Sequence, residues 1–243
     1  MRFEARIILK ETPLSVPTNY RINFMSLIKE AIRSGDDQIY QKYYGNHEQN
    51  MQKPFTFSVH LPVREKENGN LILRDNEIRF YFSSSDPVFL IHVYNGLVNL
   101  KKDYPLFRGQ RIEIRNFYLR KETRIDSDEL VFKTYSPILV RDTQNRKGKG
   151  FISSENENFK DNLFHSMRNL CRNFIREDYG LFREQVEILP VKCKRDIIRH
   201  YGGEIGTSGI IKINAPLEVL QLIYDAGLGA KRSQGFGMLE VVG

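Results

Sequence analysis

Two runs of strand-like and helix-like segments follow each other in the same order, and this order constrains the fold more than any other feature. Residues 2–10 place apolar side chains at every second position, which predicts a strand with one buried face. Residues 18–35 then carry apolar residues at helical spacing and end at a glycine. Strand patterns at residues 54–61 and 77–84, a helix starting near Pro87 and a strand at 110–122 complete the first run.

The second half repeats the order strand, helix, strand, strand, helix, strand. Its predicted segments are strands at 129–142, 186–199, 208–215 and 237–242, and helices at 159–180 and 216–229. Two consecutive βαββαβ units predict an α+β protein with tandem ferredoxin-like domains and antiparallel sheets. We place the domains at residues 1–122 and 123–243. Within the first, residues 70–74 and 77–84 flank Asp75-Asn76, which suggests a hairpin.

Charge and cysteine content narrow the class of protein. The net charge is +7, and residues 1–120 carry 18 Lys and Arg against 13 Asp and Glu, compared with 19 against 17 in residues 121–243. A polyanionic partner is favoured, and its surface must be built by folding because neither half is a basic tail. The two cysteines, Cys171 and Cys193, form no metal-binding spacing. With no signal peptide or apolar membrane span, a cytoplasmic protein is expected.

The last segment is "GLGAKRSQGFGMLEVVG", and its first eleven residues combine four glycines with two cations and two polar side chains. A dinucleotide-binding fingerprint is excluded, because here the glycines follow a helix and precede a strand. One glycine would suffice for a helix cap. Glycines also let a backbone approach phosphate oxygens closely, and cations supply charge. We therefore predict a contact with a phosphodiester backbone at Gly227, Gly229, Lys231, Arg232, Ser233, Gln234, Gly235 and Gly237.

This loop resembles the C-terminal glycine-rich loop of the CRISPR-associated repeat-cleaving endoribonucleases, and the tandem ferredoxin-like order matches over the full length. The resemblance implies processing of CRISPR precursor RNA without a metal or other cofactor, through attack by the 2′-hydroxyl that leaves a 2′,3′-cyclic phosphate and a 5′-hydroxyl. Single-stranded or hairpin repeat RNA is the implied partner. Related CRISPR proteins share looser loops without cutting RNA, so a non-catalytic RNA-binding subunit of an effector complex is the alternative. Association with effector subunits and homodimer formation are left open.

The resemblance also implies catalytic residues in "YYGNHEQNMQKPFTFS". His47 matches the family's histidine and Lys53 its lysine. An imidazole can donate or accept a proton at neutral pH, and a lysine can stabilise charge on the phosphate oxygens. The family's tyrosine on the first helix is replaced by Lys29. Lys29 then acts as a second cation, or a tyrosine of the neighbouring segment (Tyr40, Tyr43 or Tyr44) takes the missing place.

A second basic stretch, "KCKRDIIRH", extends the predicted RNA surface. Its cations Lys192, Lys194 and Arg199 are expected on one face of a strand, with Arg195 on the other. Like charges along one strand face repel each other unless an anion neutralises them. RNA contact by this strand is therefore a hypothesis.

Overall fold

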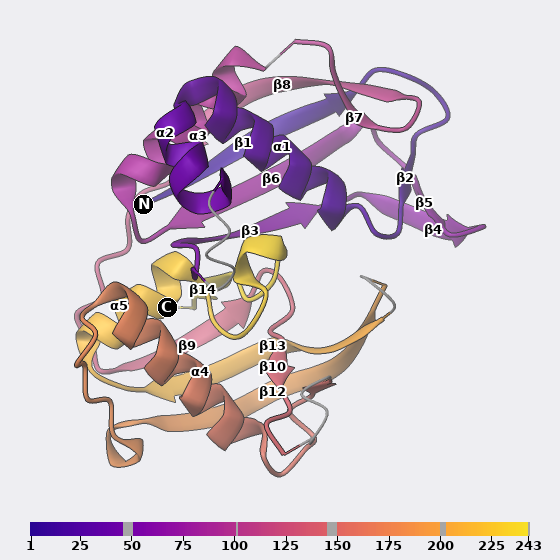
Figure 1. Cartoon of the computed structure of the whole chain (residues 1–243). Helices are drawn as coiled ribbons and strands as arrows, with labels where there is room; N and C mark the ends of the chain where they lie inside the picture. The colour runs from indigo at the N-terminus through magenta and orange to yellow at the C-terminus, as the bar shows by residue number, and fades with distance from the viewer. Residues whose placement is uncertain (46–50, 101, 145–149, 200–202, 243) are drawn as a thin grey trace. The chain divides into compact units, whose positions relative to one another are not determined.

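The computed structural model shows two compact units (Figure 1). The first unit comprises Met1–Lys53 and Ser58–Lys121, and the second comprises Pro54–Phe57 and Glu122–Gly243. The structure describes residues 1–45, 51–100, 102–144, 150–199 and 203–242. No helix among these residues is long and apolar enough to cross a membrane.

The first unit is built on a five-stranded sheet with the order β3-β6-β1-β8-β7. Strand β1, which the period-2 pattern at residues 2–10 predicted as a strand with one buried face, pairs antiparallel with both β6 and β8. The bounds are β1 (Arg2–Leu9), β3 (Phe55–His60), β6 (Glu77–Ser84), β7 (Tyr104–Phe107) and β8 (Gln110–Leu119).

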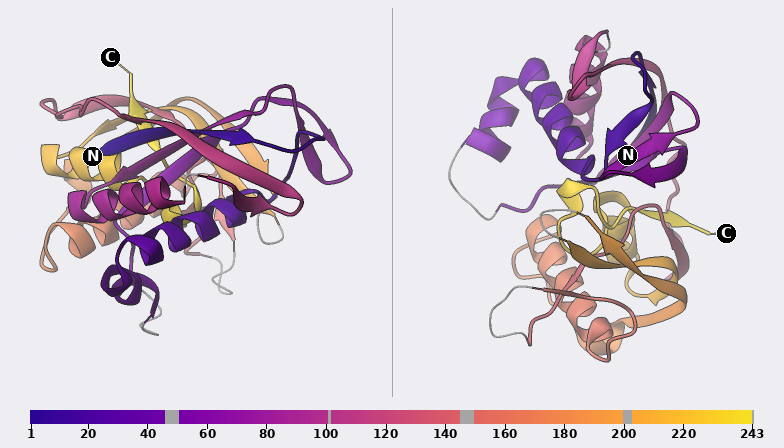
Figure 2. Two further views of the ribbon diagram at one scale, coloured as in Figure 1. Left: turned by 90° about the horizontal axis from the view of Figure 1, so that it is seen from above. Right: turned by 90° about the vertical axis from the view of Figure 1, so that its right-hand side faces the viewer.

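Helices α1 (Arg21–Gly35) and α3 (Pro87–Asn99) lie side by side on one face of this sheet (Figure 2). They approach so closely that a Cβ added at Gly96 would lie 1.8 Å from the Ala31 carbonyl oxygen. Helix α3 begins as predicted, with Pro87 in its first turn and the Asp86 side chain accepting a hydrogen bond from the Phe89 N–H. The apolar faces of both helices and of β1 form the core of this unit.

A small three-stranded sheet, in the order β2-β5-β4, corrects the hairpin predicted around Asp75-Asn76. Strand β5 pairs with β4, whereas β6 pairs with β1. The turn between β4 and β5 is Asn68-Gly69, and both residues have positive φ, the conformation of a type I′ hairpin turn. The prediction missed this stronger turn signal. The strands are β2 (Ser15–Pro17), β4 (Val63–Glu67) and β5 (Asn70–Leu73).

The second unit repeats the topology of the first. Its main sheet has the order β12-β13-β9-β14. Each of these strands has the same place in the sheet, and the same place in the order along the chain, as its counterpart in β3-β6-β1-β8 of the first unit. Two ferredoxin-like units in tandem are thus present, as predicted. The elements are β9 (Glu129–Thr134), α4 (Phe159–Phe174), β12 (Glu187–Ile198), β13 (Glu204–Asn214), α5 (Leu217–Ala226) and β14 (Leu239–Val241), with a short pair β10 (Val140–Arg141) and β11 (Phe151–Ile152) and a 3₁₀ turn η2 (Arg183–Gln185).

Candidate active site and nucleic-acid interface

A short helical segment follows α1 and carries the tyrosine-rich part of the sequence. Helix α2 (Asp37–Tyr40) is capped by Asp36, whose carboxylate accepts hydrogen bonds from two backbone N–H groups of the first turn. The chain continues as a π-helical turn, η1 (Gln41–Gly45). Tyr40 and Tyr44 therefore lie on the same side of the segment, with their rings stacked at a centroid distance of 5.6 Å.

Two lysines converge on the Tyr44 ring. The Lys29 Nζ, from α1, lies 5.3 Å from the ring centroid, and the Lys53 Nζ, from the chain just before β3, lies 4.6 Å from it. Ammonium groups at such distances are attracted to the negative face of an aromatic ring. The tyrosine thus holds together two cations that are separated in the sequence.

The electrostatics of this lysine–tyrosine cluster, formed by Lys29, Tyr44 and Lys53, fit an anion-binding site. Burial and, secondarily, the positive charge of Lys29 lower the pKa of the Lys53 ammonium. Burial and the neighbouring Tyr40 raise the pKa of the Tyr44 phenol, which therefore stays protonated at neutral pH. A bound phosphate would offset the repulsion between the two ammonium groups.

The structure distinguishes among the three tyrosines that the sequence left open. Tyr43 packs edge-on against Phe89, with a centroid distance of 4.9 Å, and burial together with the Asp86 carboxylate raises the pKa of its phenol. Tyr40 contacts Tyr44 rather than a lysine. Tyr44 is the one that contacts both predicted lysines, which spacing alone did not reveal. His47 lies outside the described residues.

The C-terminal glycine-rich loop is packed into the second unit. Its four glycines are buried and all have positive φ, at +85° for Gly227, +87° for Gly229, +87° for Gly235 and +70° for Gly237. A Cβ at Gly237 would lie 1.9 Å from the Leu228 carbonyl oxygen. Glycine is therefore required here by both backbone conformation and close packing.

Both cations of this loop have partners within the second unit. The Lys231 ammonium forms an ion pair with Glu204. Arg232 is buried, its Nη1 donates a hydrogen bond of 2.6 Å to the Ala226 carbonyl oxygen, and burial lowers its pKa to about 10. Ser233 and Gln234 are partly exposed within the 3₁₀ turn η3 (Arg232–Gln234). Contact of these residues with RNA stays a prediction, and Arg232 in addition has a structural role.

The start of β3 belongs to the same unit as this loop. Thr56 is fully buried, and its Oγ1 donates a hydrogen bond of 2.8 Å to the Phe236 carbonyl oxygen. A Cβ at Gly227 would lie 2.8 Å from the Thr56 Cβ. The segment Pro54–Phe57, which directly follows Lys53 in the sequence, is therefore fixed by the loop's own backbone.

A basic pocket lies on the main sheet of the second unit. Lys192 and Lys194, on β12, line a cavity of about 620 Å³ together with Lys133 of β9. Gly209 also lines this pocket, and its missing side chain allows close approach of β12, because a Cβ there would lie 2.0 Å from the Lys192 carbonyl oxygen. Lys133 was missed by sequence reasoning, since only the register places it opposite Ile210 and near β12.

Arg199 does not join Lys192 and Lys194 in the basic pocket, although all three were expected on one face of the strand. It follows the end of β12, is exposed, and is not among the residues that line the basic pocket. In addition, Arg199 comes five residues after Lys194, and an odd spacing along a strand puts two side chains on opposite faces. Arg195, opposite Thr207, is likewise absent from the pocket, as expected for the other face of the strand.

These features define a class: a tandem ferredoxin-like protein with a paired-lysine site in one unit and a C-terminal glycine-rich loop in the other. The family model described as "CRISPR associated protein Cas6, C-terminal" matches residues 120–241. The chain belongs to the Cas6 family.

Curated relatives agree with this assignment over nearly the whole chain. The chain is 26% identical over 254 residues to "CRISPR-associated endoribonuclease Cas6" of Pyrococcus furiosus, covering 100% of this chain and 90% of the relative. It is 25% identical over 231 residues to "CRISPR-associated endoribonuclease Cas6 1" of Methanocaldococcus jannaschii, covering 92% and 86%.

Solved structures share the fold. One described as "Characterization of a Cas6-related gene from Pyrococcus furiosus" superposes with a TM-score of 0.84 at 20% identity, covering 100% of this chain and 98% of that one. Another, described as "An RAMP protein binding different RNA substrates", gives a TM-score of 0.83 at 20% identity and covers both chains completely.

Proposed function

We propose that this Cas6-family endoribonuclease cuts the repeat RNA of CRISPR precursor transcripts, without a metal, through attack by the RNA's own 2′-hydroxyl. The observation that carries the proposal is the convergence of Lys29 and Lys53 on Tyr44, three positions before His47 in the sequence. Paired ammonium groups are suited to a phosphate that gains negative charge during reaction. The curated relatives named above, both called endoribonucleases, support the activity.

In the proposed reaction the 2′-oxygen forms a bond to phosphorus as the bond from phosphorus to the 5′-oxygen breaks. The 2′-hydroxyl loses a proton to a base, and the departing 5′-oxygen gains one from an acid. His47 serves in one of these proton transfers, because an imidazole exchanges protons near neutral pH. The pKa values of Tyr43 and Tyr44 are raised, so neither phenol is suited to be the base. Lys53 and Lys29 stabilise the charge on the non-bridging oxygens.

The reaction is tested with repeat RNA incubated in excess EDTA. We expect cutting, and no cutting of the same RNA with a single 2′-deoxy group just upstream of the scissile phosphate, because the nucleophile is then absent. The downstream product should accept a label from polynucleotide kinase directly, which marks a 5′-hydroxyl end. Cleavage of the 2′-deoxy RNA would require a hydrolytic mechanism instead.

The pH dependence of cutting tests the coupling between the two lysines. If protonated Lys53 is required, activity is lost as pH rises through its pKa, which is held below the ordinary lysine value. Lys29→Gln removes one cause of that lowering, so the alkaline limb of the single-turnover pH profile should move to higher pH. Lys42→Gln, an exposed lysine of the same segment, is the matched control and should leave the limb in place. An unmoved limb in Lys29→Gln would rule out the coupling.

A further inference from the structure

The first unit's sheet has a face that α1 and α3 do not cover. Strand β1 buries its odd-numbered side chains in the core, and its even-numbered residues Glu4 and Arg6 point to the other face. The register with β6 and β8 places Arg79 and Arg115 directly opposite Arg6. Three arginines thus form a row across three adjacent strands. Like charges directly opposite each other destabilise a sheet, unless counter-charges lie nearby.

Nearby carboxylates neutralise this row only in part. Glu77 lies 3.6 Å from the Arg6 guanidinium and 3.8 Å from that of Arg79, and Glu113 lies 2.8 Å from that of Arg115. The arginine side chains remain 36%, 49% and 54% exposed, respectively. Solvent-accessible guanidinium groups are therefore available along the whole row.

A second row carries aromatic side chains and lies two residues further along β6, three further along β8 because of an irregularity in its pairing, and two residues back along β1. The register places Tyr81 and Tyr118 on either side of Glu4. The Arg6 guanidinium lies 5.4 Å from the Tyr118 ring centroid, and that of Arg120 lies 5.7 Å from the Tyr81 ring centroid. Tyr118 is 45% exposed. Each ring is therefore contacted by a guanidinium. The arginines in and beside the two rows, Arg6, Arg79, Arg115 and Arg120, outnumber the glutamates there, Glu4, Glu77 and Glu113.

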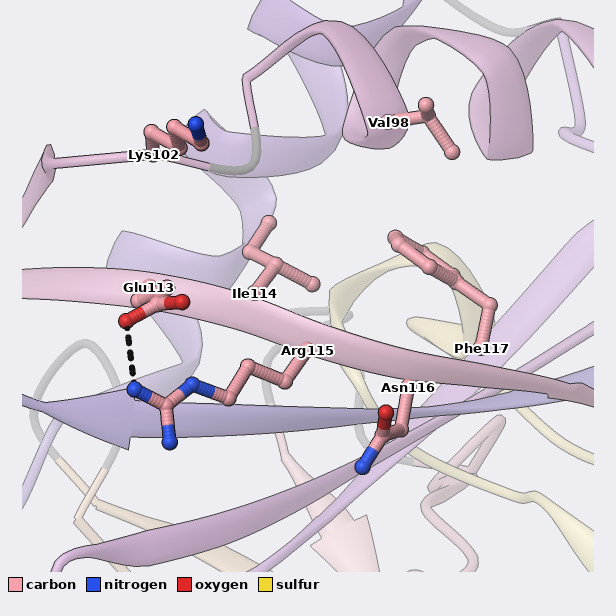
Figure 3. Close-up of a pocket in the computed structure, with 7 residues that line it drawn as sticks. All are labelled: Val98, Lys102, Glu113, Ile114, Arg115, Asn116 and Phe117. Atoms are coloured by element: carbon pink, nitrogen blue, oxygen red, sulfur yellow. Dashed lines mark hydrogen bonds and ion pairs between the residues drawn. The ribbon is translucent and has the colours of Figure 1, made fainter.

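The β8 end of these rows borders a pocket. Strand β7 pairs with β8 only as far as Ile112, so within the described chain β8 has no partner strand on that side beyond this point. A cavity of about 360 Å³ lies there (Figure 3). Figure 3 shows Phe117 pointing toward Val98, and Arg115 lying on the opposite side of β8. Arg115 thus joins the arginine row to the rim of this pocket.

We infer that this arginine–tyrosine face, formed by Arg6, Arg79, Arg115, Arg120, Tyr81, Tyr118 and Glu4, binds a single-stranded segment of RNA. This inference rests on the proposed function for the choice of RNA as ligand. Aromatic rings stack on bases that are splayed out, which a duplex does not offer, and arginines neutralise phosphates. Strand spacing puts the tyrosines about 10 Å apart and the two rows about 7 Å apart. One row then contacts bases while the other follows the backbone, and the Glu4 carboxylate accepts a hydrogen bond from a base amino group.

Stacking is tested by fluorescence anisotropy with a fluorescein-labelled 12-mer of uridine, free or annealed to its complement. Tyr81→Ala and Tyr118→Ala should each weaken binding of the single strand about fivefold or more. Tyr81→Phe and Tyr118→Phe keep the aromatic face and are the matched controls, expected to bind like the wild type. Thermal unfolding confirms that each variant is folded. Equal affinity of the alanine and phenylalanine variants, or tighter binding of the duplex, would overturn the inference.

A second arm tests the arginine row. Arg6→Gln should lower the slope of log affinity against log salt concentration by about one, as expected for the loss of one phosphate contact. Arg64→Gln, which alters an exposed arginine on the small sheet, should leave the slope unchanged. An equal slope in both variants would remove Arg6 from the RNA contact.

Cutting of repeat RNA separates the two proposals. If the wild type cuts repeat RNA but the tyrosine-to-alanine variants bind the 12-mer normally, the proposed RNA contact at the arginine–tyrosine face is wrong and the proposed function is retained. If binding of the 12-mer depends on the tyrosines but repeat RNA is never cut, RNA binding by the arginine–tyrosine face is supported and the proposed function is wrong.

Discussion

His47→Ala is expected to slow single-turnover cutting of repeat RNA by roughly 100- to 10,000-fold, the usual contribution of a proton-transferring side chain. The loss should appear in EDTA, with enzyme in excess over labelled RNA, so that binding does not limit the rate. His60→Ala is the matched control, because His60 is an exposed histidine at the end of β3. It should cut like the wild type.

Affinity must be measured beside this rate. RNA carrying the 2′-deoxy group binds without being cut, so the wild type and His47→Ala should bind it equally. Undiminished cutting by His47→Ala would remove the imidazole from the mechanism. Tight binding by a wild-type protein that never cuts would instead favour a non-catalytic RNA-binding subunit.

Gly237→Ala is expected to lower the free energy of unfolding by about 3 kcal/mol or more, because a methyl group meets a carbonyl oxygen and the backbone has positive φ. Gly109→Ala is the matched control: its φ is +73°, against +70° at Gly237, but its Cβ would have no neighbour within 4 Å. That variant should lose only about 1 kcal/mol, the cost of the left-handed conformation. Urea unfolding of both variants gives the comparison.

Equal losses in the two variants would show that the contact with the Leu228 carbonyl does not exclude a side chain. A larger loss at Gly237 would tie the glycine to folding. Packing accounts for the glycines at 227, 229 and 237 without any ligand, whereas the sequence interpretation assigned them to RNA contact. RNA binding by wild-type and folded loop variants must therefore be compared at temperatures well below unfolding.

Local patterns predicted the main strands and helices of both units but not the small three-stranded sheet. Alternation at residues 2–10 predicted β1, and Pro87 marked the start of α3, because both signals depend on neighbouring residues only. The hairpin at Asp75-Asn76 was wrong because a better turn, Asn68-Gly69, lay a few residues upstream. The residues of a turn determine which neighbouring strands pair as a hairpin, and the prediction did not use the Asn68-Gly69 signal.

The candidate site was foreseen in part. The resemblance selected Lys53 and Lys29, and the structure brings both to one ring. Sequence left Tyr40, Tyr43 and Tyr44 equivalent, since their spacing does not say which one faces α1. The packing of Tyr43 on Phe89 settles the orientation of the segment.

The amino-acid order by itself determined which segments form strands and helices, which side of each strand is buried, and the tandem repeat of one topology. Tertiary structure alone decided which side chains meet: Tyr44 with two lysines, Lys133 with Lys192, and Arg6 between Arg79 and Arg115. The reason is physical. Hydrophobic periodicity is a property of neighbours along the chain, whereas strand register and helix packing depend on residues many tens of positions apart.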